Sequence, residues 1–197
     1  MIPVLFLDFD GPLFPERGIG LSPPISEYPS KLKLHPFISY WEMDRTSVRQ
    51  LNSLYDIYPF DTVVSSSWKN FVEVDQVVEL FQVNGLNLHL HENWCTTSKM
   101  TSQRHQEISM WLDDYTVNDV CPDHIILDDP MSGSSLDGGV HKLMRFSEPV
   151  FINPDVGIDT EAFIIMNNRV TLWASEESSI FNRGKRVYSG VGPLAGF

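Results

Sequence analysis

Three short apolar segments, far apart in the chain, each end in a group of polar side chains. The first of them is an unbroken apolar run closed by a polar turn, which is typical of a strand buried in a parallel sheet, and the other two read as further short strands. The carboxyl ends of parallel strands meet at one edge of a sheet, where ligands bind, so we expect these polar groups to lie together. The segments are 3–8, which ends at Asp8 with Asp10 two positions on; 61–68, which contains three serines; and 124–129, which ends in Asp128 and Asp129.

Strand-like and helix-like segments alternate along the rest of the chain, which predicts a doubly wound α/β fold with a mainly parallel, Rossmann-like sheet. We expect a single catalytic domain over 1–173, with a proline-rich flap at 13–44, no large cap and a tail at 174–197. Besides the three strands above, the pattern predicts strands at 86–91, 149–153 and 169–173. It also predicts four helices: one capped by Asp44 or Thr46, one at 73–83, one that begins at Thr101 or Ser102, and one at 159–167.

Composition excludes several classes of protein. The net charge of −12 argues against a broad nucleic-acid surface, although a local basic patch remains compatible with it. Cys95 and Cys121 are too few for a disulfide framework, which favours free thiols in the cytoplasm. No apolar run reaches membrane-spanning length, so we expect no membrane partner.

Four carboxylates at one sheet edge would repel one another unless a cation offsets their charge. Mg²⁺ fits, because it takes hard oxygen ligands and is usually held by one or two carboxylates together with a phosphate. One carboxylate could then attack phosphorus, a second could move protons, and a hydroxyl and a Lys or Arg could hold the phosphoryl oxygens. The pattern therefore indicates phosphoryl chemistry.

The same segments resemble the motifs of the haloacid dehalogenase-like (HAD) superfamily. FLDFDGPL is similar to its first motif, a strand followed by D-x-D-G; VVSSSW to its second; and IILDD to its fourth, a strand ending in two acids. More narrowly, the chain resembles a small-capped branch that includes HAD domains associated with RNA repair and with phage or bacterial genomes. The pieces that carry this narrower resemblance are Ser66-Ser67-Trp68, 104–112 and 157–160.

The resemblance implies a role for each matching residue. Asp8 matches the nucleophile and metal ligand, and Asp10 the general acid and base, with its backbone carbonyl reaching the metal. Ser65 is the first choice for the hydroxyl that binds the phosphoryl group, and Ser66 the second. The remaining matches are Gly11 in the phosphate-holding loop, Asp128 as a metal-holding acid, and Asp129 as an acid that ligates the metal directly or through water.

The third motif of the superfamily supplies a Lys or Arg, and two residues could fill it. Arg104 lies at the start of the expected helix, and Lys99 lies five positions earlier. Arg104 could instead form a surface pair with Glu107, three positions on in the helix. The chain departs from the family pattern at Pro12, where the family usually has Val or Thr, and this removes one backbone N–H from the loop.

These observations predict a Mg²⁺-dependent phosphomonoester hydrolase that forms an aspartyl-phosphate. The acidic charge favours a small phosphorylated substrate, with nucleoside monophosphates first, whereas the absence of room for a large cap would admit the ends of nucleic acids. A polynucleotide 3′- or 5′-end phosphatase is thus the second hypothesis. A catalytically silent HAD-like interaction module and a phosphoacceptor receiver domain are rival hypotheses from different classes of protein, but the intact D-x-D-G on the first strand disfavours both.

Overall fold

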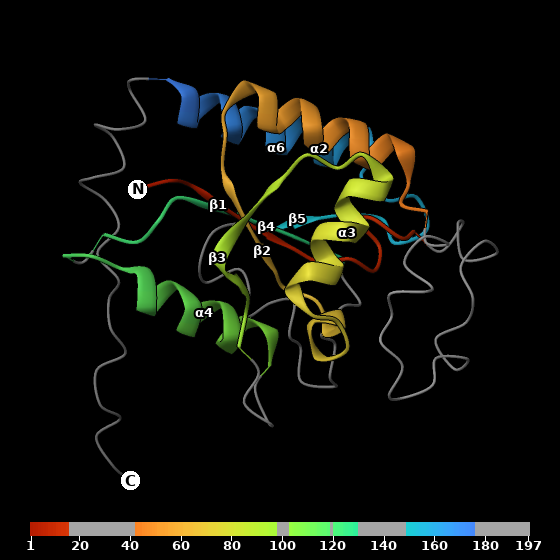
Figure 1. Ribbon diagram of the computed structural model, residues 1–197. Coiled ribbons are helices and arrows are strands. Elements are labelled where there is room, and N and C mark those ends of the chain that lie inside the picture. The colour runs from red at the N-terminus through yellow and green to blue at the C-terminus, as the bar shows by residue number, and fades with distance from the viewer. Residues whose placement is uncertain (16–41, 98–102, 119, 130–148, 176–197) are drawn as a thin grey trace, which may run out of the picture.

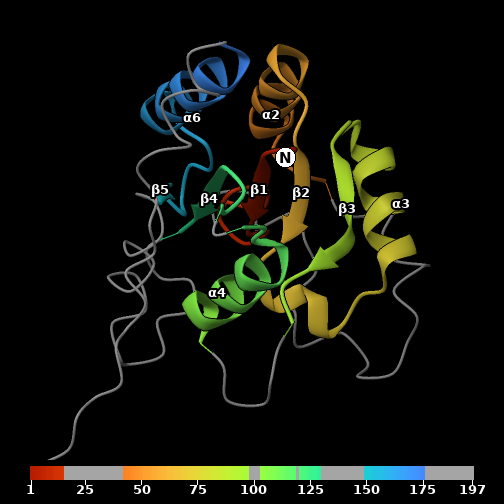
Figure 2. The same ribbon diagram turned by 90° about the vertical axis from the view of Figure 1, so that its left-hand side faces the viewer.

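Five parallel strands form one sheet in the order β3-β2-β1-β4-β5 (Figure 1). The computed structural model describes residues 1–15, 42–97, 103–118, 120–129 and 149–175. β1 lies at the centre of the sheet, and helices cover both faces (Figure 2). The strands are β1 (Val4–Leu7), β2 (Asp61–Val64), β3 (His89–Cys95), β4 (His124–Asp128) and β5 (Val150–Phe151).

Two apolar clusters hold the helices against the sheet, because successive side chains of a strand point to opposite faces. Leu5 and Leu7 of β1 belong to the larger cluster, which also contains the buried faces of α2, α3 and α6. Val4 and Phe6 belong to the smaller cluster, which contains Ile108, Trp111 and Leu112 of α4. The helices are α2 (Arg45–Ile57), α3 (Val74–Asn84), α4 (Arg104–Tyr115) and α6 (Thr160–Ala174), with a short 3₁₀ helix, η3 (Ser67–Asn70), after β2.

Local sequence signals set several helix ends. Of the two caps predicted for α2, Asp44 is the one observed, and its side chain accepts a hydrogen bond from the Ser47 N–H at 2.8 Å. α3 stops before Gly85, whose φ of +69° is the left-handed conformation that glycine adopts easily. α4 begins at Arg104 with Gln103 as its N-cap, so the expected start at residues 101 or 102 is displaced along the chain.

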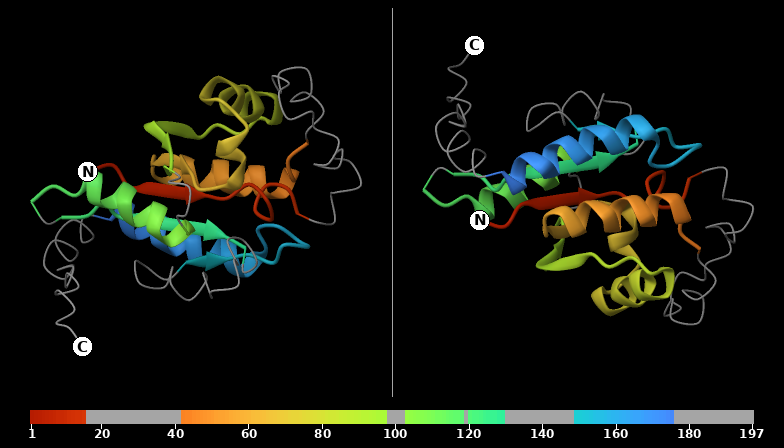
Figure 3. Two further views of the ribbon diagram at one scale, coloured as in Figure 1. Left: turned by 90° about the horizontal axis from the view of Figure 1, so that it is seen from below. Right: turned by 90° about the horizontal axis from the view of Figure 1, so that it is seen from above.

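The predicted final strand at 169–173 is wrong, because α6 continues through these residues to Ala174. Ala162, Met166 and Val170 are buried at four-residue intervals, so the helical face that starts in the first turn of α6 extends into the supposed strand. This face meets α2, which runs beside α6 over the sheet (Figure 3). The predicted strand at 86–91 is also displaced, since β3 begins only at His89.

The flap at 13–44 lies mostly outside the described residues, as does nearly all of the tail at 174–197. Within the described residues there is no second folded unit of the size of a large cap. None of the helices described is long and apolar enough to cross a membrane.

Candidate active site

The register of the three central strands brings their ends into one row. Leu7 pairs with Val64 of β2 on one side and with Leu127 of β4 on the other. The residues that follow are therefore neighbours, and the Asp8 N–H donates to the Leu127 carbonyl at 3.0 Å. Asp8, Ser65 and Asp128 thus meet at the carboxyl edge of the sheet, as predicted.

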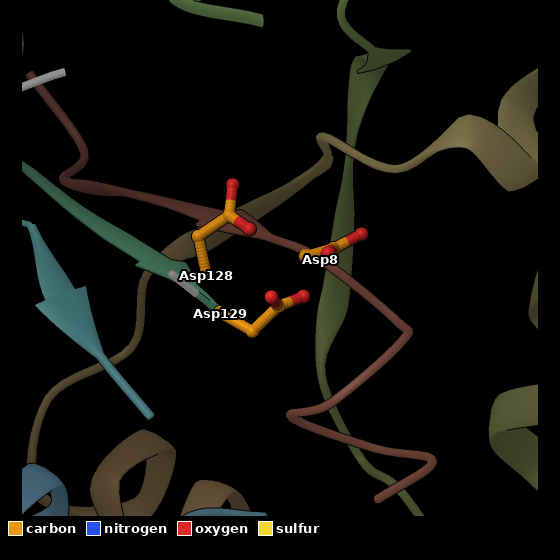
Figure 4. Close-up of side chains that lie close together, drawn as sticks. All are labelled: Asp8, Asp128 and Asp129. Atoms are coloured by element: carbon orange, nitrogen blue, oxygen red, sulfur yellow. The ribbon is translucent and has the colours of Figure 1, made fainter. Parts of the chain in front are cut away.

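Three carboxylates from two strands converge at this edge (Figure 4). Asp8, Asp128 and Asp129 are buried, and one oxygen atom from each lies within 4.8 Å of the others. The set offers only oxygen ligands, and Asp128 Oδ1 is buried without a hydrogen-bond partner among the residues described. A hard divalent cation such as Mg²⁺ suits this donor set, and its charge would offset the mutual repulsion.

Arg104 reaches the same acids from the first turn of α4. Its Nη1 lies 3.1 Å from Asp8 Oδ2 and 2.8 Å from Asp128 Oδ2. Burial would lower the pKa of Arg104, but Asp128 and Asp8 more than offset this, so its pKa is raised and the guanidinium stays charged. Burial also raises the pKa of Asp128 well above its usual value, against the opposing effect of Arg104.

The structure therefore places Arg104 against Asp8 and Asp128, and its role as the phosphoryl-binding cation stays a prediction. The surface pair with Glu107 does not form, because Glu107 is buried and pairs with Lys69. Lys99 lies outside the described residues, so its candidacy as the phosphoryl-binding cation stays a prediction.

Asp10 lies beside the acid cluster, and its side chain faces Trp68. The indole Nε1–H is 3.1 Å from both Asp10 Oδ1 and Asp10 Oδ2. Burial, and next the charge of Asp8, raise the pKa of Asp10 to about 6. A carboxyl group with such a pKa can both give and take a proton near neutral pH, which is what a general acid and base requires. That its carbonyl reaches a metal stays a prediction.

The two candidate serines have different surroundings. Ser65 Oγ is buried and has no hydrogen-bond partner among the described residues, so it is available to a ligand. Ser66 Oγ caps η3 and accepts from the Trp68 N–H at 3.4 Å. Which of the two serines binds the phosphoryl group stays a prediction, with Ser65 first.

The turn after β1 explains Gly11 and accommodates Pro12. Gly11 has φ +85°, and a Cβ there would lie 2.9 Å from Ile152 Cδ1 and 3.0 Å from Asp129 Cβ. The turn is closed by the N–H groups of residues 11, 13 and 14, so none of these bonds needs a donor at Pro12. The Gly11 N–H already donates to the Phe14 carbonyl at 3.1 Å, within the turn itself. The role of Gly11 in phosphate binding therefore stays a prediction.

Sequence reasoning missed Lys69, and it gave Trp68 no role beyond the motif. Lys69 Nζ pairs with Glu107 of α4 and lies 2.9 Å from Thr96 Oγ1, after β3. The Lys69–Glu107 pair thus links η3 to the helix that carries Arg104. The available signal was the position of Trp68 and Lys69 directly after the serines, but their partners are 58 and 38 positions away in the chain.

Comparison with known proteins agrees with this arrangement. Residues 4–163 match the family described as the HAD domain in Swiss Army Knife RNA repair proteins. No curated protein and no solved structure matches the chain significantly. The match spans most of the 197 residues and includes every strand of the sheet. The chain therefore belongs to this family of HAD domains, for which phosphatase-type hydrolysis is the activity implied in general.

Proposed function

We propose that the protein is a Mg²⁺-dependent phosphomonoester hydrolase that works through an aspartyl-phosphate on Asp8. The observation that carries this proposal is the buried group of Asp8, Asp128 and Asp129 with the Arg104 guanidinium on two of them. A buried group of acids is costly to keep for structure alone, because each carboxylate loses its hydration. A bound cation and a phosphoryl group would together give each of these residues a ligand to contact.

In the first step, an Asp8 carboxylate oxygen attacks phosphorus and the bond from phosphorus to the ester oxygen breaks. Asp10, in its protonated form, gives its proton to the departing oxygen. In the second step, the Asp10 carboxylate takes a proton from water as the water oxygen attacks the aspartyl-phosphate. Inorganic phosphate leaves, Asp8 is restored as a carboxylate, and Asp10 is again protonated.

The other residues stabilise the charge on the group being transferred. The Ser65 hydroxyl would donate a hydrogen bond to a phosphoryl oxygen, and Arg104 would balance negative charge beside Asp8. Asp8, Asp128 and Asp129 would hold Mg²⁺, which supplies positive charge to the phosphoryl oxygens in enzymes of this chemistry.

For the substrate, we place the phosphorylated end of an RNA strand first. The family description names RNA repair proteins, and the described residues include no large cap that would enclose a small molecule. A nucleoside monophosphate is the second candidate, favoured by the net charge of −12, since an acidic surface repels a polynucleotide.

Phosphate release from an aryl phosphate, with and without Mg²⁺, tests the reaction. We expect release by the wild type that requires Mg²⁺ and is lost in Asp8→Asn. No release by the wild type, or full release by Asp8→Asn, would refute the mechanism.

A second assay tests the substrate. We expect 3′- or 5′-phosphorylated RNA oligonucleotides to have a higher kcat/KM than mononucleotides at one fixed salt concentration, and the preference to weaken steeply as salt rises. A preference for mononucleotides that salt does not change would favour the small substrate.

A further inference from the structure

Trp68 holds the turn that carries Asp10 by two different parts of its ring. The indole N–H lies 3.1 Å from each Asp10 carboxyl oxygen. The face of the ring stacks on Phe14, with ring centroids 4.9 Å apart and planes 12° from parallel. Asp10 and Phe14 belong to one turn, in which the Gly11 N–H donates to the Phe14 carbonyl. Trp68 therefore contacts both ends of this turn.

The indole itself has little freedom to turn away. Phe9 meets it edge to face, with centroids 5.4 Å apart, while Phe14 covers one of its faces. Its backbone lies in the first turn of η3, and the Ser66 hydroxyl accepts from the Trp68 N–H. A side chain fixed by two aromatic contacts loses little further entropy in donating one hydrogen bond.

The indole N–H is a donor only, so it can bond the Asp10 carboxyl group with or without its proton, although it favours the carboxylate. In the protonated carboxyl group, one oxygen carries the proton and the other accepts a hydrogen bond. Since Nε1 lies equally far from the two oxygens, it can donate to whichever oxygen does not carry the proton. After the proton has moved, the same N–H can donate to the carboxylate.

We propose that Trp68 is a positioning residue that orients the Asp10 carboxyl group for proton transfer to the leaving oxygen. This inference rests on the proposed function, because it assigns Trp68 to the first chemical step. Orientation matters here, since proton transfer requires the acid to lie within hydrogen-bond reach of the ester oxygen. Trp68 hydrogen-bonds to Asp10 and not to the substrate, so its effect on the reaction is exerted through Asp10.

The test compares phosphate monoesters whose leaving groups need different amounts of help from an acid. A nitrophenolate leaves readily without a proton, phenolate less so, and the alkoxide of glycerol phosphate hardly at all. The quantity to measure is kcat/KM, which covers the steps up to departure of the leaving group and excludes later hydrolysis of the aspartyl-phosphate. None of these substrates carries a nucleobase, so stacking of a base on Trp68 plays no part.

Trp68→Phe keeps an aromatic ring against Phe14 and removes the N–H. We expect kcat/KM for glycerol phosphate to fall by about tenfold, because general acid catalysis contributes about 10²–10⁴-fold and Asp10 itself remains. For nitrophenyl phosphate the expected fall is under about twofold, since that leaving group hardly needs the acid. Phenyl phosphate should lie between the two.

Trp111→Phe is the matched control. It removes another indole N–H, which donates to the Asn93 carbonyl at 3.1 Å, from a buried tryptophan in the cluster around α4. This variant loses packing and a hydrogen bond without touching Asp10. Its ratio of kcat/KM between the two extreme substrates should equal that of the wild type.

Equal falls on all substrates in Trp68→Phe, or no fall, would overturn the inference, because a packing role does not distinguish leaving groups. If Trp68→Phe does not fold, benzothienylalanine introduced at position 68 decides the question, since it keeps the bicyclic ring and lacks only the N–H. Failure of the proposed function would appear differently, as the absence of Mg²⁺-dependent release by the wild type or as its persistence in Asp8→Asn.

Discussion

Removal of Lys69 alone should destabilise the protein more than removal of Lys69 and Glu107 together. The side chains of the two residues are only 6% and 7% exposed, so Lys69→Met leaves a buried carboxylate without its cation. Breaking a buried pair in this way costs about 3–5 kcal/mol of unfolding free energy. We expect the lower end, about 3 kcal/mol, because the Thr96 hydroxyl lies 3.3 Å from Glu107 Oε2 and can still donate to it.

The double variant Lys69→Met with Glu107→Met replaces both charges by apolar groups of similar length. Such replacements are often neutral, so we expect a free energy of unfolding within about 1 kcal/mol of the wild type. Urea denaturation, followed by circular dichroism, measures the free energy of unfolding of the wild type, Lys69→Met and the double variant. In thermal denaturation, the loss in Lys69→Met corresponds to a lower Tm by about 6–12 °C for a chain of this size.

An exposed hydrogen-bonded pair provides the control. His89 Nδ1 lies 2.7 Å from Asp61 Oδ1, with the His89 side chain 66% exposed, so His89→Gln should cost under about 1 kcal/mol. If the double variant is as unstable as Lys69→Met, the cost does not come from an unpaired buried charge. The loss would then have to be assigned to the packing of the Lys69 side chain, which refutes the electrostatic explanation.

Two further predictions concern the turn after β1. Gly11→Ala should lower the free energy of unfolding by more than Gly85→Ala does: both positions have positive φ, which costs about 1–2 kcal/mol for alanine, but only Gly11 also meets atoms of Ile152 and Asp129 within 3.0 Å. Equal losses in urea denaturation would show that the turn can shift. The pH dependence of kcat/KM for glycerol phosphate should reflect the protonation of Asp10. As pH rises above about 6, the fraction of Asp10 that carries a proton falls, so kcat/KM should fall as well. A profile that stays flat up to about pH 8 would contradict the assignment of Asp10 as the acid.

The sequence predicts the part of the site that strand ends define. The apolar runs before Asp8, Ser65 and Asp128 are local signals, and parallel pairing places their ends in one row whatever the loops do. The raised pKa of Asp10 and the nearness of Arg104 to Asp8 depend on distances across the fold, so only the structure gives them.

The features that the sequence did not predict depend on competing local signals or distant partners. Residues 169–173 contain β-branched and aromatic side chains that suit a strand, but Val170 continues the buried face of α6, and tertiary packing prevails. Trp68 and Lys69 carry no periodic signal within a four-residue 3₁₀ helix. Their roles follow from partners in other elements, which no local pattern identifies.

Charge balance at the acid cluster predicts opposite effects of Arg104→Met on metal binding and on catalysis. Mg²⁺ binds the ionised forms of Asp8, Asp128 and Asp129, and in that form Arg104 reduces the local charge from −3 to −2. Removing this cation should strengthen Mg²⁺ binding, so that Mg²⁺ raises Tm more in the variant than in the wild type. The same change should lower kcat for phosphate release by about 10²-fold or more, because a positive charge beside the phosphoryl group is lost. Arg49→Met on α2, where the guanidinium bonds the Arg45 carbonyl at the surface, should change neither quantity. A smaller effect of Mg²⁺ on Tm in Arg104→Met would show that the guanidinium helps to build the metal site, and the expected gain in Mg²⁺ affinity would be refuted.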